Sequence, residues 1–141
     1  MKKAIPPIAC FLLISLFAYT GLSKLSDHTV FHSQLNGLPF IQYAAPVLWW
    51  LLPVLELGIA IILVVPKLRL TGYYMSAILL FLFTVYLGGM ILSGMELPCS
   101  CGGVIQYLSW KQHIILNIFF IILSVMGIYF QKGAELSTHI V

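Results

Sequence analysis

Charged residues are scarce in this chain: only 8% of its 141 residues are Asp, Glu, Lys or Arg, whereas 61% are hydrophobic. A soluble domain carries about 25% charged residues, and a chain this short leaves much of its surface exposed after folding. A water-soluble fold is therefore excluded, and the expected surroundings are the lipid bilayer. The Lys and Arg residues are also scattered along the chain rather than clustered, so nucleic acid is not an expected partner.

Four long runs have almost no charge. A helix needs about 20 apolar residues to cross the hydrocarbon core of a bilayer, and the runs of that kind cover residues 4–23, 47–65, 70–92 and 113–130. Their only Asp, Glu, Lys or Arg residue is Glu56. The apolar residues are continuous rather than alternating, which excludes a membrane β-barrel. The sequence therefore predicts an all-α integral membrane protein, a bundle of four transmembrane helices forming a single domain over residues 1–141.

The first run shares one feature with a secretory signal peptide, the lysines that precede it. A signal peptide has a shorter apolar stretch and ends at a small-residue cleavage site. The run over residues 4–23 is too long, and no clean site of that kind follows it. We therefore expect an uncleaved first helix.

The basic residues are unevenly divided between the two sides of the expected bundle. Two lie in the segments 24–46 and 93–112, whereas the other five lie at the termini or in the short turn between the second and third runs: Lys2, Lys3, Lys67, Arg69 and Lys132. Since Lys and Arg are enriched in cytoplasmic loops, we expect both termini in the cytoplasm. Segments 24–46 and 93–112 are then extracytoplasmic, in a multi-pass protein of the bacterial inner membrane.

Cysteine is rare too, and two of the three cysteines stand one residue apart, as Cys99-Ser100-Cys101, in the second extracytoplasmic segment. That compartment is oxidising. A disulfide across one residue closes a small, strained ring, and strained bridges are readily reduced, as in catalytic and regulatory pairs. The interpretation that we favour is a thiol-disulfide redox pair.

Two alternatives to the redox pair stay open. One is an inert bridge that shapes the loop, although so small a ring adds little stability. The other is a metal site, although zinc needs three or four ligands and this cysteine spacing is not the usual one. Histidines that could complete such a site are His28, His32 and His113.

Glu56 lies near the middle of the second run. A carboxylate inside the membrane is costly, so such a residue is a candidate functional site. Lys24, at the end of the first run, is one expected partner, and the others are Tyr19, Thr20, Tyr86 and Asn117. Two roles are open: Glu56 either ties helices together or takes part in proton movement.

The start of the fourth run combines a cap with two polar side chains. Ser109 and Gln112 have the spacing of a capping box, in which each side chain bonds the backbone N–H of the other residue. His113 and Asn117 are four residues apart and so share one helix face. They are expected to line a polar opening beneath the cysteine segment, or to act as interface residues.

Several motifs together resemble the MauE/DoxX-like membrane family. The first helix ends with Tyr19-Thr20-Gly21-Leu22-Ser23-Lys24-Leu25, followed by Asp27 and Phe31. The second contains Pro53-x-x-Glu56-x-Gly58, and Pro98-Cys99-x-Cys101-Gly102-Gly103 precedes the fourth, which carries Trp110 and Asn117 near its start. The ordered set extends over most of the chain.

The resemblance implies a DoxX-like four-helix bundle and a role in maturation. Members named for methylamine utilisation are associated with maturation of the disulfide-rich small subunit of methylamine dehydrogenase, and other DoxX-like members with oxidoreductase assemblies or quinone-linked sulfur oxidation. Our hypothesis is a membrane thiol-disulfide component or maturation factor acting on an extracytoplasmic thiol protein or dehydrogenase subunit. Its exchanging pair is Cys99 and Cys101, and its supporting residues are Glu56, Lys24, His113 and Asn117.

Two alternatives to this function stay open: a non-enzymatic membrane assembly subunit, and a DoxX-type subunit linked to quinone. A single cysteine pair must pass its electrons on, to a quinone or to another protein. Neither acceptor has a signature in the sequence. A small-molecule transporter is disfavoured, because the spans offer few polar residues besides Glu56.

Overall fold

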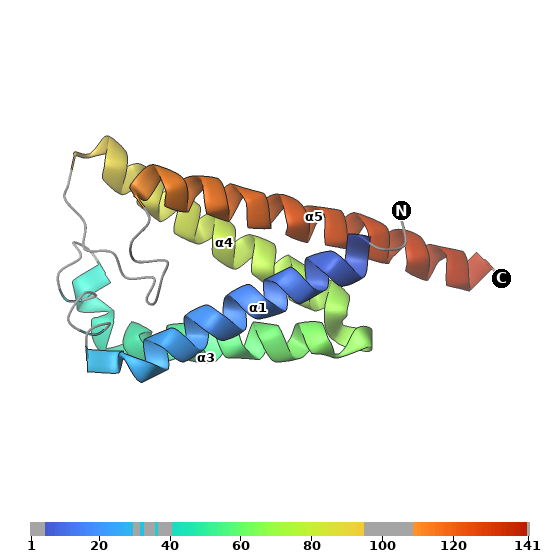
Figure 1. Cartoon of the computed structure of the whole chain (residues 1–141), viewed down its shortest axis with the longest axis horizontal. Coiled ribbons are helices and arrows are strands. Elements are labelled where there is room, and N and C mark those ends of the chain that lie inside the picture. Colours follow the sequence, from blue (N-terminus) through green and yellow to red (C-terminus); the bar gives the residue numbers. More distant parts are fainter. Residues whose placement is uncertain (1–4, 30–31, 33–35, 37–40, 95–108, 141) are drawn as a thin grey trace.

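The computed structural model describes residues 5–29, 32, 36, 41–94 and 109–140. Within them, four helices are long and apolar enough to cross a membrane: α1 (Ile5–Ser26), α3 (Ala45–Val64), α4 (Arg69–Leu92) and α5 (Trp110–Ile140). These described residues contain no β-strand. The long helices all extend along the long axis of the molecule, and α1 and α4 slant in opposite directions across it (Figure 1). The prediction of an all-α bundle with four membrane-crossing helices is confirmed.

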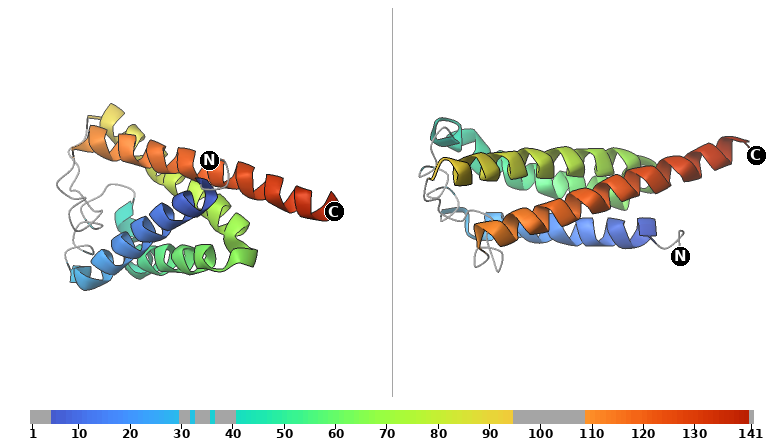
Figure 2. Two further views of the ribbon diagram at one scale, coloured as in Figure 1. Left: turned by 45° about the vertical axis from the view of Figure 1, so that its right-hand side comes forward. Right: turned by 90° about the horizontal axis from the view of Figure 1, so that it is seen from above.

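The helices extend beyond some of the apolar runs that predicted them. Helix α1 continues to Ser26, past residue 23, and α5 continues to Ile140, past residue 130. Hydropathy marks only the part of a helix that lipid covers, whereas good helix formers such as Ala134, Glu135 and Leu136 carry the backbone hydrogen bonds onward. The last turns of α5 are exposed and project beyond the other helices (Figure 2).

The bundle is built from two closely packed pairs, α1 with α3 and α4 with α5, and further contacts of α1 with α5 and of α3 with α4 complete it. Glycines permit two of these approaches. A Cβ on Gly127 of α5 would lie 2.5 Å from the Tyr73 ring of α4, and one on Gly21 of α1 would lie 2.9 Å from the Leu57 side chain of α3. Small residues at helix interfaces have this role in membranes, where packing replaces the hydrophobic effect between helices.

One end of the bundle is fastened by side chains that bond to backbone carbonyls. The short 3-10 turn Pro66–Leu68 connects α3 to α4. Beside it, the Leu63 carbonyl accepts hydrogen bonds from Arg69 Nε at 3.2 Å and from Cys10 Sγ at 3.3 Å. Tyr73 donates its hydroxyl to the Pro6 carbonyl at 2.8 Å. The buried thiol of Cys10 therefore has a structural place, at the N-terminal half of α1.

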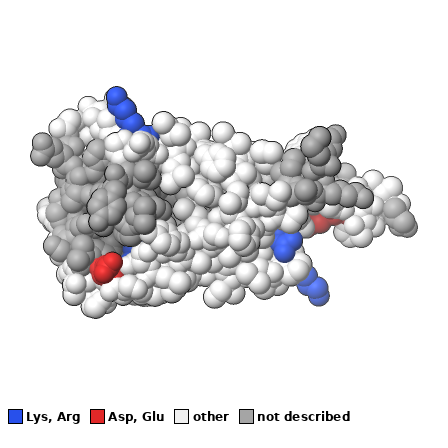
Figure 3. All heavy atoms as spheres, viewed as in Figure 1, with Lys and Arg blue, Asp and Glu red and all other residues white. Residues whose placement is uncertain are grey.

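The outer surface of the helices is apolar. On the face drawn in Figure 3, charged side chains lie toward the two ends, and the described middle section shows none. Every long helix carries large apolar residues that are each more than half exposed, among them Phe11, Ile61, Phe81, Ile115 and Ile122. Lipid tails cover such a surface, so the chain is a multi-pass membrane protein in contact with the bilayer.

Candidate functional site

An ion pair joins α1 to α3 inside the bundle. Lys24 Nζ donates to Glu56 Oε1 at 2.5 Å, and the two residues are only 6% and 8% exposed. Lys24 lies in the last turn of α1, whereas Glu56 lies near the middle of α3. The lysine side chain therefore extends back along the bundle to reach the carboxylate. Each charge neutralises the other where water is scarce.

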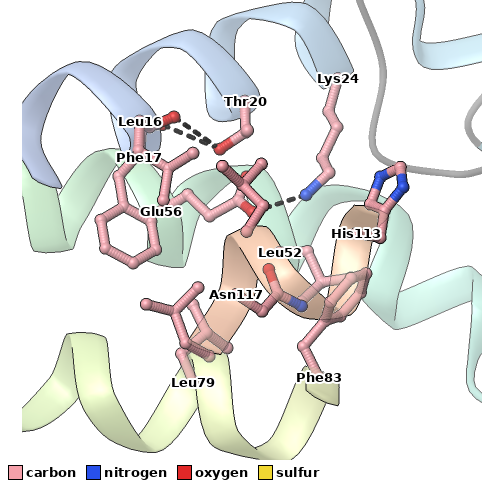
Figure 4. Close-up of a pocket in the computed structure, with 12 residues that line it drawn as sticks. Leu16, Phe17, Thr20, Lys24, Leu52, Glu56, Leu79, Phe83, His113 and Asn117 are labelled. Carbon is pink, nitrogen blue, oxygen red and sulfur yellow. Dashed lines mark hydrogen bonds and ion pairs between the residues drawn. The ribbon is translucent and has the colours of Figure 1, made fainter. Parts of the chain in front are cut away.

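The ion pair lies at the edge of a hollow that all four long helices enclose (Figure 4). Its polar lining consists of Thr20, Lys24, Glu56, His113 and Asn117. The rest of the lining is apolar: Leu16, Phe17, Leu52, Leu79, Leu80, Phe83 and Leu116. The free volume inside the hollow is about 60 Å³. With the open space at its mouth included, the volume is about 590 Å³. Mostly apolar walls with a few convergent polar groups are typical of ligand sites.

Helix α5 contributes a histidine and an amide. His113 is 1% exposed and Asn117 is 8% exposed, and both line the hollow, as their spacing of one helical turn requires. The capping box at Ser109 and Gln112 sets where this helix begins, and its prediction is confirmed. Gln112 N–H donates to Ser109 Oγ at 3.3 Å, and Ser109 N–H donates to Gln112 Oε1 at 2.9 Å.

Two buried polar atoms in this lining have no hydrogen-bond partner among the described residues: Glu56 Oε2 and Asn117 Nδ2. The nearby Thr20 hydroxyl donates to the carbonyl of Leu16 on its own helix, at 3.0 Å. An unsatisfied buried polar group costs about 1–3 kcal/mol. The hollow therefore presents one acceptor and one donor that a bound molecule or water could satisfy.

Among the partners considered for Glu56, the structure brings Lys24 into contact. The amide nitrogen of Asn117 and the buried hydroxyl of Tyr86 have no hydrogen-bond partner within the described part of the chain, so neither bonds to the carboxylate. Tyr19 is 40% exposed and does not line the hollow.

The histidines of the metal alternative lie in different surroundings. The ring centroids of His28 and His32 lie 6.3 and 6.0 Å from that of Trp49. His113, in contrast, lines the hollow. Among the described residues, no three His, Cys, Asp or Glu side chains form a group that could hold a metal ion. Cys99 and Cys101 lie outside the described residues, so their pairing stays a prediction.

Sequence reasoning missed the apolar half of the hollow. The polar lining residues were predicted, because a polar side chain in an otherwise apolar run is a candidate functional residue. Nothing distinguished Phe17, Leu79 or Phe83 from the many apolar residues that face lipid. The residue of α4 that was expected near Glu56 is Tyr86, which does not line the hollow. Only the packing of the four helices shows which apolar residues face inward.

Comparison with known proteins supplies the family. The model of the family described as "Methylamine utilisation protein MauE" matches residues 2–130, which is most of the chain. No curated protein and no solved structure matches it. The chain belongs to the family of the methylamine utilisation protein MauE.

Proposed function

We propose that this protein is a membrane thiol-disulfide component, or maturation factor, that acts on an extracytoplasmic protein through Cys99 and Cys101. The observation that carries the proposal is the spacing of these cysteines, one residue apart in the segment that connects α4 to α5. A bridge in so small a ring is strained and exchanges readily with other thiols.

The compartment is argued from charge. Five basic residues lie at the termini and in the α3–α4 turn, against two on the opposite side. This distribution favours a cytoplasmic position for the termini in the bacterial inner membrane. The segment between α4 and α5 then lies on the oxidising side, where a disulfide is stable enough to be used.

The reaction is a disulfide exchange. A thiolate of the partner attacks the Cys99–Cys101 disulfide and forms a mixed disulfide. The second partner thiol then displaces the cysteine that is still bound. The partner dithiol is thereby oxidised to a disulfide. The Cys99–Cys101 disulfide is reduced to two thiols, which carry the two electrons and two protons that the partner lost. The family's link to methylamine utilisation supports a dehydrogenase subunit as the partner.

Thiol trapping in intact cells tests this function. A Cys99→Ser or Cys101→Ser variant cannot complete the exchange, so we expect a mixed disulfide with a partner that disappears on reduction. The double variant should form none and should lose function. The matched control is Cys10→Ser, because Cys10 is buried in the N-terminal half of α1 and its thiol donates to the Leu63 carbonyl of α3.

Two outcomes contradict the proposal. If the double variant supports every phenotype of the wild type, the cysteines have no redox role, and a non-enzymatic assembly subunit is the better description. If a reporter fused beside Ser100 proves cytoplasmic, the pair lies in a reducing compartment and the proposed exchange has no oxidising environment.

A further inference from the structure

We infer that the hollow between the four helices holds a short file of water molecules, which carries protons between His113 and the Glu56 carboxylate. This role depends on the lining of the hollow and involves no cysteine, so it is independent of the proposed function. Three features of the lining support it: the free volume, two unsatisfied polar atoms, and the depth of its polar side chains in the bundle.

The free volume of the hollow fits water and little else. A water molecule takes up about 30 Å³ of the liquid, whereas a ring such as benzene needs a cavity of about 150 Å³. The hollow has about 60 Å³ of free volume, which corresponds to about two waters. Lys24 and Glu56 also compensate each other's charge at 2.5 Å, so a neutral molecule is favoured over an ion.

Buried polar atoms in the lining provide the hydrogen bonds that such waters need. Internal water occupies sites where it finds two to four polar partners. Asn117 Nδ2 is a donor without an acceptor, and Glu56 Oε2 is an acceptor without a donor, each within the described part of the chain. Both residues are nine-tenths buried, so water that bonds to these atoms removes two desolvation costs.

The polar side chains of the lining lie at successive depths in the bundle. Helices α3 and α5 begin at the same end of the molecule (Figure 1). At a rise of about 1.5 Å per residue, Glu56 lies about 16 Å along α3, whereas Asn117 and His113 lie about 10 and 4.5 Å along α5. The hollow therefore connects a carboxylate deep in the bundle with an imidazole near its end.

His113 is suited to pass a proton and to keep other solutes out. It is only 1% exposed, although the preceding residues Lys111 and Gln112 are exposed. An imidazole can take up a proton on one ring nitrogen and release another from the second, which makes histidine a common proton shuttle. A buried histidine at this place therefore admits protons to the file without opening it.

The transfer moves protons and no electrons. His113 gives a proton to the first water, each water passes one of its own protons onward, and the last gives one to Glu56 Oε2. The carboxylate becomes a carboxyl group while Lys24 keeps its charge, so the ion pair that joins α1 to α3 loses its attraction. The other lining residues of these helices and of α4 do not titrate.

Radiolytic footprinting of the purified protein tests for the waters, because hydroxyl radicals formed from a bound water oxidise the side chains beside it. Phe17 and Phe120 are a matched pair: they are 2% and 9% exposed, and only Phe17 lines the hollow. We expect oxidation of Phe17 to exceed that of Phe120, and Asn117→Leu to remove the excess. Equal oxidation of both rings in the wild type would overturn the water file.

Infrared spectroscopy after a rapid step to acid pH tests the proton path. The band of a protonated carboxyl group that is missing in Glu56→Gln belongs to Glu56, and its rise gives the rate of proton arrival. Because a positioned proton carrier speeds transfer by about 10²-fold or more, His113→Ala should slow this rise about a hundredfold. Added imidazole should restore the rate, which a purely structural role of the ring does not explain.

A control variant and two contrary results complete the test. Ser124→Ala removes a buried hydroxyl on α5 that bonds the Phe120 carbonyl and does not line the hollow, so neither oxidation nor rate should change. Elution of each variant as a monodisperse species shows that it folds. An unchanged rate in His113→Ala, or no Glu56 band at any pH at which the protein stays folded, would overturn the proton path.

Discussion

Lys24 and Glu56 pair across α1 and α3, with 2.5 Å between Nζ and Oε1, although each residue is less than a tenth exposed. Two opposite charges in such a place are expensive to desolvate, and their attraction offsets that cost only while both are present. The pair therefore restricts how α1 and α3 can be arranged. It also keeps the Glu56 carboxylate beside the hollow.

Removing one charge of this pair should destabilise the protein more than removing both. Lys24→Met leaves a buried carboxylate without its cation and is expected to lower the free energy of unfolding by about 3–5 kcal/mol. In the double variant Lys24→Met/Glu56→Leu, no buried charge is left and the loss should be smaller. Unfolding of the purified variants in detergent, arranged as a double-mutant cycle, measures the coupling. Additive losses would mean that the two side chains do not interact.

The contact between Gly127 and Tyr73 gives a prediction about packing. A Cβ on Gly127 would lie 2.5 Å from the buried ring, so Gly127→Ala must displace the ring or separate α4 from α5. Overpacking of this kind costs about 1–3 kcal/mol, which thermal unfolding in detergent would show.

Gly133→Ala is the matched control for that substitution. It lies on the same helix, and nothing lies within 4 Å of the position that its Cβ would take. Since alanine favours a helix over glycine by about 1 kcal/mol, its stability should stay the same or rise. Equal destabilisation by both changes would show that the loss does not come from the contact with the Tyr73 ring.

Much of the site was predicted from the sequence because its polar members are conspicuous. Glu56 is a charge in an otherwise uncharged run, and His113 and Asn117 have the spacing of one helical turn. The choice of Lys24 over the other partners of Glu56 was not predictable, since it depends on how far α1 extends and how it rotates against α3. The apolar walls were not predictable either, because inward and lipid-facing residues have the same chemistry in a membrane.

The capping box at the start of α5 should contribute to stability. Ser109→Ala removes the hydroxyl that accepts from the Gln112 N–H and should cost about 0.5–2 kcal/mol. Ser109→Asp keeps an acceptor at the same place and should restore most of the loss. Unfolding of the three proteins in detergent tests this, and equal stability of Ser109→Ala and the wild type would show that the cap is not needed.

The last turns of α5 permit a test of orientation. Ser137 is exposed there, beyond the apolar section of the helix, so a cysteine at this site should react with a water-soluble maleimide. In a Cys99→Ser/Cys101→Ser background, the basic-residue count predicts that Ser137→Cys is labelled only after the inner membrane is permeabilised. The native Cys10 is the internal reference: it is 4% exposed and bonded to the Leu63 carbonyl, so it should react only once the protein is unfolded.

Labelling of Ser137→Cys in intact cells, after disruption of any outer membrane, would place the end of α5 outside. The cysteine segment at the other end of α5 would then lie in the cytoplasm, which is the arrangement that thiol oxidation cannot use.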